Sequence, residues 1–101
     1  MLLTGKQTKH LRSLAHSLDA IVTVGRSASD EGLSDGVVKE TLRALDDHEL
    51  IKVKLPAGDK KERRKLLDDL GTKTESAAVQ LIGRIGVLYR PGESPTIKLP
   101  K

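Results

Sequence analysis

Apolar residues recur at helical spacing near the N-terminus and at strand spacing soon afterwards. Thr4 and Gln7 have the spacing of a capping box, in which two free backbone N–H groups of the first helical turn are satisfied. The β-branched run over residues 20–24 predicts a short buried strand that ends at Gly25. The apolar face of the predicted N-terminal helix, which begins after Thr4, consists of Leu11, Leu14, Ala15 and Leu18.

A second helix and a second strand follow a polar segment. Residues 26–32 are rich in Ser, Asp, Glu and Gly, which is typical of a loop. Ser34 has the position of an N-cap, and we expect a helix from there to about Asp47–His48. Within residues 50–55, apolar residues alternate with two lysines from Ile51 onward, which predicts a strand with both lysines on one face.

A basic helix and a pair of antiparallel strands complete the predicted elements. The helix runs from about Lys60 to Leu70, and the glycine that follows it is expected to end it. Strands are predicted at residues 78–82 and 87–90, with residues 83–86 as the hairpin loop between them. A further short edge strand is expected at residues 96–99.

The predicted order of elements is α-β-α-β-α-β-β, in a single domain that spans residues 1–101. Each β-α-β step needs a right-handed crossover, which places helices against a face of the sheet. The last two strands form an antiparallel hairpin. We therefore predict an α/β fold of the mixed (α+β) kind, in which a four-stranded mixed sheet is packed with three helices.

The composition indicates an aliphatic core and an anionic partner. The chain contains one Tyr, no Phe and no Trp, and its 18 Lys and Arg against 14 Asp and Glu give a net charge of +4. It has no Cys, which excludes a disulfide scaffold and thiolate chemistry. No segment approaches the ~20 apolar residues of a membrane helix, so we expect a cytoplasmic protein without a membrane partner.

The sequence contains no recognisable catalytic arrangement. His10 and His16 lie six positions apart, so a helix would direct them differently, and neither belongs to a metal-binding motif. Residues 46–49 include acidic and basic types, but they lie where a helix is predicted to end. We therefore expect no enzyme, and hence no catalytic residue, metal ion, cofactor or small-molecule substrate.

The segment from Gly25 to Gly32 is the first candidate binding site. It connects a predicted strand to a predicted helix, where free backbone N–H groups can bind an anion. A glycine lets a phosphate approach the backbone closely, and Arg26 would add a charge-assisted donor. The alternative is an ordinary turn, in which Gly and residues such as Ser27 are expected.

Further cations could extend this site. Lys52 and Lys54 share a predicted strand face, and a buried face would not tolerate two ammonium groups, so that face meets solvent or an anion. The cations of residues 60–65 are interleaved with acidic residues, which favours a solvated helix face over a contact with RNA. Three more cations lie on the predicted N-terminal helix, namely Lys6, Lys9 and Arg12. The sequence leaves open whether they share one surface with the two lysines of the strand.

Recognition by stacking of bases on aromatic rings is not favoured. Modules that bind single-stranded RNA in that way need exposed aromatic side chains. Only Tyr89 is available, and its strand position suggests that it is partly in the core. Recognition of backbone and shape by Lys, Arg and loop amides remains.

Seven collinear segments cover nearly the whole chain: LTGKQ at Leu3–Gln7, LRSLAH at Leu11–His16, VTVG at Val22–Gly25, HELIKVKL at His48–Leu55, VQLIGR at Val79–Arg84, VLYRP at Val87–Pro91 and IKLP at Ile97–Pro100. Together they resemble the YhbY-like CRM domain family (chloroplast RNA splicing and ribosome maturation). The HELIKVK and VLYRP segments are quite specific to this family when they occur together.

The resemblance implies an RNA-binding domain associated with precursors of the large ribosomal subunit. It also implies a fold like the C-terminal domain of bacterial initiation factor three, with a KH-like GxxG loop that contacts RNA. On this sequence that loop begins at Gly25, with Arg26 at the usual basic position. Aligned without a gap, the motif covers residues 25–28 and lacks its second glycine. Aligned from the HELIKVK segment, the second glycine is Gly32 with four residues inserted, and we prefer this register because it keeps the helix cap and the helix length. The acidic pair Asp30 and Glu31 within the insertion would oppose RNA phosphate.

We therefore expect the chain to bind RNA, namely ribosomal RNA of the large-subunit precursor. The alternative is a protein-interaction module that docks on ribosomal particles through a basic ribosomal protein, which the acidic pair would contact. The candidate RNA-binding residues are Lys6, Lys9, Arg12, Gly25, Arg26, Ser27, Gly32, Lys52, Lys54 and Arg84.

Overall fold

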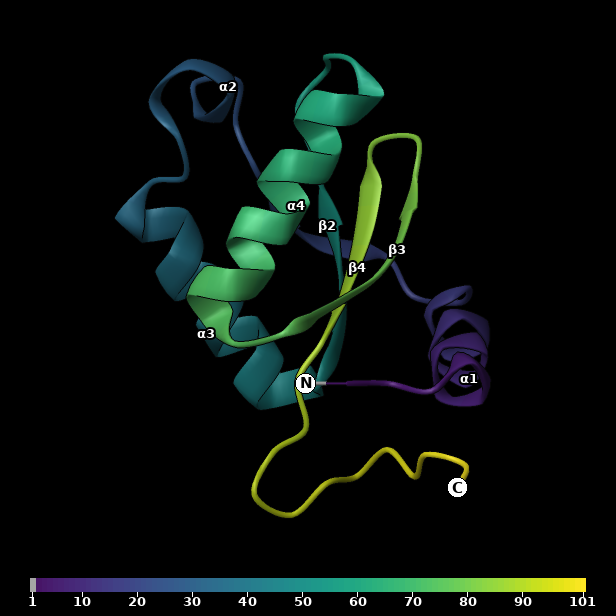
Figure 1. Cartoon of the computed structure of the whole chain (residues 1–101). Helices are drawn as coiled ribbons and strands as arrows, with labels where there is room; N and C mark the ends of the chain where they lie inside the picture. The colour runs from purple at the N-terminus through teal and green to yellow at the C-terminus, as the bar shows by residue number, and fades with distance from the viewer. Residues whose placement is uncertain (1) are drawn as a thin grey trace.

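Four strands form one mixed sheet, and helices cover both of its faces (Figure 1). The computed structural model describes residues 2–101. The strands lie in the order β1-β2-β4-β3, with β1 parallel to β2 and β4 antiparallel to both of its neighbours. This confirms the predicted fold class. In chain order the elements are α1 (Gly5–Ala15), β1 (Ala20–Thr23), α2 (Ala28–Glu31), α3 (Asp35–His48), β2 (Leu50–Lys54), α4 (Lys60–Thr74), β3 (Ala77–Ile82) and β4 (Ile85–Tyr89).

Each face of the sheet has its own apolar core. On one face α3 and α4 contribute Leu45, Leu67 and Leu70, which pack with residues of the sheet such as Ile51 and Val53. The predicted alternation along β2 is therefore confirmed, since its lysines lie on the other face. There α1 packs over a smaller core that consists of Leu11, Ala15, Leu50, Val79, Val87 and Tyr89.

The predicted helix starts are confirmed, but the predicted end of α4 was wrong. Thr4 and Gln7 form the capping box at α1, and Ser34 Oγ accepts a 3.2 Å hydrogen bond at the start of α3. Gly71 lies inside α4 because the helix continues to Thr74 and ends at Glu75, whose φ is +54°. A Cβ atom at Gly71 would lie 3.1 Å from a backbone oxygen of the chain that leaves the helix. Gly71 therefore allows the chain after α4 to pass close to the helix, and it does not end the helix.

Three other expectations also differ from the structure. The β3–β4 hairpin has only two loop residues, Gly83 and Arg84, and Gly83 takes a φ of +56° that suits such a tight turn. Residues 96–99 form no strand. Leu14 and Leu18 are each 38% exposed, because α1 turns other residues toward the sheet.

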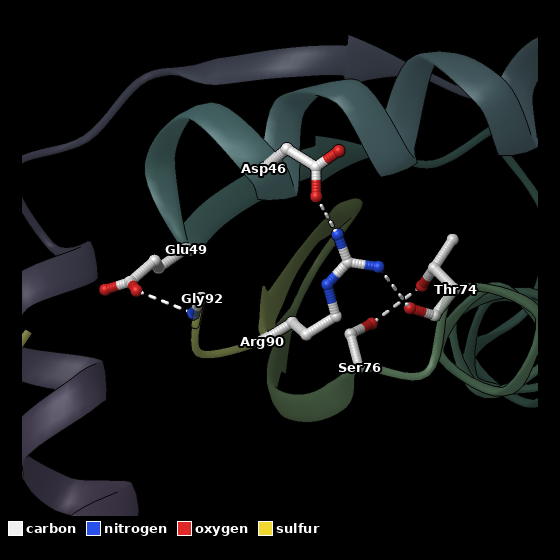
Figure 2. Close-up of polar contacts among 6 residues, drawn as sticks. All are labelled: Asp46, Glu49, Thr74, Ser76, Arg90 and Gly92. Carbon is white, nitrogen blue, oxygen red and sulfur yellow. Dashed lines mark hydrogen bonds and ion pairs between the residues drawn. The ribbon is translucent and has the colours of Figure 1, made fainter. Parts of the chain in front are cut away.

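Glu49 explains why the C-terminal segment lies where it does. This buried residue has a φ of +62°, and its carboxylate faces the chain beyond β4 (Figure 2). It accepts hydrogen bonds from the backbone N–H groups of Gly92 at 2.7 Å, Thr96 at 3.0 Å and Ile97 at 3.0 Å. The bond from Gly92 is the largest of the interactions that lower the pKa of Glu49 below its usual value. The segment is thereby held against the α1 core, where Ile97 and Leu99 pack.

Arg90, directly after β4, contacts both α3 and α4, the helices on the face of the sheet opposite to α1. Its guanidinium donates a 3.1 Å hydrogen bond to the carbonyl oxygen of Thr74 near the end of α4. It also forms an ion pair with Asp46 of α3 (Figure 2). The side chain of Arg90 is 23% exposed but that of Asp46 is 70% exposed, so the ion pair lies at the surface and the hydrogen bond to Thr74 is the better-shielded contact of Arg90.

Candidate nucleic-acid interface

The helix α1 covers only one end of its face of the sheet. Leu50, Val79 and Tyr89 lie buried beneath α1, whereas the opposite end of the same face is uncovered. An exposed isoleucine is prominent there, since Ile82 is 64% exposed. We call this region the open sheet face, and it consists of Thr23, Lys52, Lys54, Gln80, Ile82 and Ile85.

The strand register arranges the open sheet face as cations beside an apolar strip. Lys52 of β2 lies opposite Val87 of β4, and Lys54 lies opposite Ile85. On the far side of β4, Ile82 lies opposite Ile85. Because side chains directly opposite each other in a sheet are neighbours, each lysine projects next to an aliphatic side chain.

A bulge in β3 brings one polar side chain into this region. The register shifts between Ala78 and Gln80, so that one residue of β3 is inserted relative to β4. As a result Val79 packs in the α1 core while Gln80, its neighbour in sequence, faces the same side of the sheet and opposes Val87. No sequence signal indicated this irregularity.

A groove of about 250 Å³ lies between α1 and the open sheet face. Cations from both elements line it, so the structure places Arg12 and Lys52 on one surface, which the sequence left open. Arg12 Nε donates a 3.4 Å hydrogen bond to the carbonyl oxygen of Val79, and this bond holds the side chain toward β3. Sequence reasoning missed the other residues of the lining: His16, Gln80, Ile82, Ile85 and Val87.

The loop after β1 and the β3–β4 hairpin lie at the same end of the sheet (Figure 1). The N–H of Val24 donates to the carbonyl oxygen of Lys54 at 2.8 Å, which fixes the start of the loop beside the end of β2. Leu55 is joined to Arg84 by two hydrogen bonds, of 2.7 Å between backbone groups and 2.9 Å from the guanidinium Nε. The backbones of Arg26, Lys54 and Arg84 are thus gathered at one edge of the open sheet face.

The glycine-bounded segment, predicted to be a loop, contains the one-turn helix α2, so the described chain has α1–α4 in place of the three helices that were expected. Ala28 is buried, and α2 faces the first turns of α4 across a shallow cleft. Gly32 has a φ of +82°, a conformation that favours glycine. Gly25 does not need to be glycine for folding, because a Cβ atom there would meet nothing within 4 Å. Within residues 2–101, no hydrogen bond engages the backbone N–H groups of residues 25–27, which remain available to a ligand.

The cations around the open sheet face have no carboxylate partners within the described chain. Among residues 2–101, ion pairs join only Arg64 to Asp68, at 3.5 Å, and Arg90 to Asp46. Unpaired cations on one surface produce a positive potential that attracts polyanions.

The remaining predicted RNA-binding residues lie on α1 or in the loop after β1. Lys9 is exposed one helical turn before Arg12, and helical periodicity places Lys6 on the side of α1 away from the buried residues. Ser27 and Gly32 are exposed within the loop. The cations of residues 60–65 begin α4, which packs on the other face of the sheet.

Residues 2–101 contain neither a membrane-spanning helix nor a cluster of metal-binding side chains. No helix in this range is long and apolar enough to cross a bilayer. No three His, Cys, Asp or Glu side chains in it come together in a group that could hold a metal ion.

Comparison with known proteins yields similar sequences of nearly equal length. An RNA-binding protein of Haemophilus influenzae is 41% identical over 99 residues, which cover 98% of this chain and 96% of that protein. A probable RNA-binding protein of Pseudomonas aeruginosa is also 41% identical, with 98% and 91% covered. A probable RNA-binding protein of Bacillus subtilis, YqeI, is 37% identical, with 98% and 100% covered.

A solved structure and a family model agree with these relatives. The solution structure of the hypothetical protein SAV1595 from Staphylococcus aureus matches with a TM-score of 0.83 and 37% identity, covering 98% of this chain and all of that one. The model of the CRS1 / YhbY (CRM) domain matches residues 3–90, which confirms the resemblance noted in the sequence. The chain therefore belongs to the CRS1 / YhbY (CRM) domain family.

Proposed function

We propose that this protein binds RNA through the open sheet face and its two borders, α1 and the loop after β1. The observation that carries the proposal is the convergence of three cations without carboxylate partners around an uncovered part of the sheet: Arg12 of α1 with Lys52 and Lys54 of β2. Arg26 and Arg84 extend this surface at one edge. The names of the relatives support RNA as the polyanion.

Recognition of the sugar–phosphate backbone suits these side chains. Lysine and arginine neutralise phosphate and release counterions, which supplies affinity without sequence specificity. The free backbone N–H groups after Gly25 add neutral donors at the edge of the surface, and the absence of a side chain there leaves room for a phosphate.

We further propose that the RNA is ribosomal RNA of the large-subunit precursor. The support is the family resemblance, which implies a role in ribosome maturation. Crosslinking in cells, followed by sequencing of the bound RNA, tests this directly. The expected result is a peak on precursor ribosomal RNA of the large subunit, and a distribution spread evenly over messenger RNAs would contradict it.

A double charge reversal tests the proposed surface. Arg26→Glu combined with Lys52→Glu should weaken binding to ribosomal RNA fragments by about tenfold or more, because two phosphate contacts become repulsive. The matched control is Lys39→Glu with Lys73→Glu, which makes the same change of charge at exposed positions on α3 and α4. Equal loss in both double variants, at unchanged unfolding midpoints, would contradict the proposed surface.

A second candidate function is docking on ribosomal particles through a basic ribosomal protein. It is favoured by Asp30 and Glu31, which are exposed on α2 and belong to no ion pair within residues 2–101. Digestion of RNA by nuclease separates the two functions. Release from the particles after complete digestion supports RNA binding, whereas continued association supports the protein contact.

We expect binding without catalysis. The relatives are named for RNA binding and not for a reaction. Metal-dependent cleavage of RNA by the purified protein that is lost in His48→Ala would overturn this expectation.

A further inference from the structure

We propose that the groove between α1 and the open sheet face holds one unpaired nucleobase of the bound RNA. This inference rests on the proposed function and adds to it a site for the base, where the surface described above recognises only the backbone. It also assigns a role to His16, Gln80, Ile82 and Ile85, which backbone recognition does not explain.

The size and the floor of the groove suit a single ring system. Its volume of about 250 Å³ is below the roughly 300–1,000 Å³ that is typical of pockets for drug-sized ligands. Ile82, Ile85 and Val87 supply an aliphatic floor. Ile82 is 64% exposed in the free protein, so an apolar ring face placed against it would remove apolar surface from water.

Two planar side chains border the floor, from Arg12 of α1 and from His16, the residue that caps the end of α1. His16 and Arg12 both line the groove, and both are exposed. An imidazole ring and a guanidinium plane can each stack on a splayed-out base, as aromatic rings do in other RNA-binding modules. The hydrogen bond from Arg12 Nε to the carbonyl oxygen of Val79 holds this plane beside the groove before RNA arrives. The lack of Phe and Trp therefore does not exclude contact with a base.

Gln80 supplies polar recognition. The bulge in β3 directs this half-buried side chain into the groove, and its amide makes no hydrogen bond within residues 2–101. A free amide offers both a donor and an acceptor, which is what the edge of an unpaired base requires. Lys52 lies on the β2 side of the groove, where it can neutralise the phosphate of the same nucleotide.

This arrangement predicts that RNA with accessible bases is preferred. In a duplex the ring faces are stacked and the edges are paired, so the groove cannot receive them. A single strand or a bulged nucleotide presents both. The surface cations alone would bind any of these RNAs, with an affinity that follows the number of phosphates.

The test compares two probes with equal charge. The first probe is an octamer of adenylate, and the second is an octamer with the same sugar–phosphate backbone but without bases. The wild-type protein should bind the adenylate octamer about fivefold to tenfold more tightly, near the lower end of what one stacked base contributes. Equal affinity for the two octamers would overturn the inference. The proposed function would still stand in that case if Arg26→Glu with Lys52→Glu weakened the binding of both octamers.

Three single variants localise the effect. His16→Ala changes the residue that caps α1, and Gln80→Ala and Ile82→Ala change β3. Each should reduce the ratio of the two affinities toward one, because the loss of affinity for the adenylate octamer exceeds any loss for the abasic octamer. His10→Ala is the matched control for His16, because His10 lies on α1, the helix that His16 caps, and does not line the groove. Ile21→Ala is the control for Ile82, since Ile21 is 47% exposed and lies on the edge strand β1. A ratio that survives all three groove variants would also overturn the inference.

Discussion

The carboxylate of Glu49 accepts a 2.7 Å hydrogen bond from the backbone N–H of Gly92, although the two residues lie 43 positions apart (Figure 2). Two further backbone N–H groups, of Thr96 and Ile97, donate to the same carboxylate. A single buried side chain therefore organises a segment that has no regular secondary structure of its own. The segment in turn contacts α1, since Gln7 Nε2 donates to the carbonyl oxygen of Pro100 at 3.1 Å.

Removal of the Glu49 carboxylate should release this segment. Glu49→Ala leaves the three backbone N–H groups without their charged acceptor, and we expect a loss of about 1–3 kcal/mol in the free energy of unfolding. Urea unfolding measures this loss, and hydrogen exchange should show faster exchange at residues 92–97. Glu93→Ala, at an exposed position of the same segment, is the control and should change neither quantity. Unchanged exchange in Glu49→Ala would show that Ile97 and Leu99 alone hold the segment.

Acid should weaken the same anchor. The hydrogen bonds lower the pKa of Glu49 in the folded state, so the folded protein binds a proton there less readily than the unfolded chain does. The resulting stabilisation is fully present above the usual pKa of a glutamate, about 4.3, and is lost as the pH falls through the lower pKa of the folded state. Urea unfolding at a series of pH values should therefore show a steeper loss of stability below about pH 4.3 in the wild type than in Glu49→Gln. Parallel curves would contradict this assignment.

The one tyrosine of the chain reports on its surroundings. Burial raises the pKa of Tyr89 above its ordinary value, and the negative charge of Glu49 raises it further. An absorbance titration of the folded protein should therefore show ionisation above the pH of a free tyrosine. In Glu49→Gln the pKa should move part of the way back, because the effect of burial remains. Stability should fall as the pH rises past about 10, since only the unfolded chain ionises easily there.

The two glycines of the loop should behave differently when they are replaced by alanine. Gly32→Ala forces a side chain into a φ of +82° and should cost about 1–2 kcal/mol of stability. Gly25→Ala meets no neighbouring atom, so the unfolding midpoint should stay close to that of the wild type. Its affinity for RNA should nevertheless fall, because the added methyl group faces the proposed phosphate. Full affinity in a stable Gly25→Ala protein would remove this part of the surface.

The salt dependence of RNA binding should identify the phosphate contacts. Each phosphate neutralised on a single strand contributes about 0.7 to the slope of log affinity against log salt. Lys52→Ala and Arg84→Ala should each reduce that slope by about this amount. Lys65→Ala, an exposed position on α4, should leave the slope unchanged. An equal reduction in all three variants would place the RNA elsewhere or spread it over both faces.

The sequence by itself determined the starts of the three long helices, the four strands of the sheet and the side of β2 on which its lysines lie, but not the one-turn helix α2 or the lack of a strand at residues 96–99. Periodicity and capping are local properties, and this is why Thr4, Ser34 and the alternation from Ile51 to Leu55 were interpreted correctly. Local reasoning was wrong about Gly71 because the close approach of the chain after α4 is a contact between elements, which no helix-end rule contains.

Only the tertiary structure decided which cations share a surface and what else lies among them. The groove exists because α1 covers only one end of its face of the sheet and because β3 has a bulge before Gln80. Both features depend on packing between distant segments. The burial of Glu49 likewise depends on residues more than forty positions away. The local pattern specifies which residues can form a helix or a strand, but the position of one element on another follows from contacts that the local pattern does not contain.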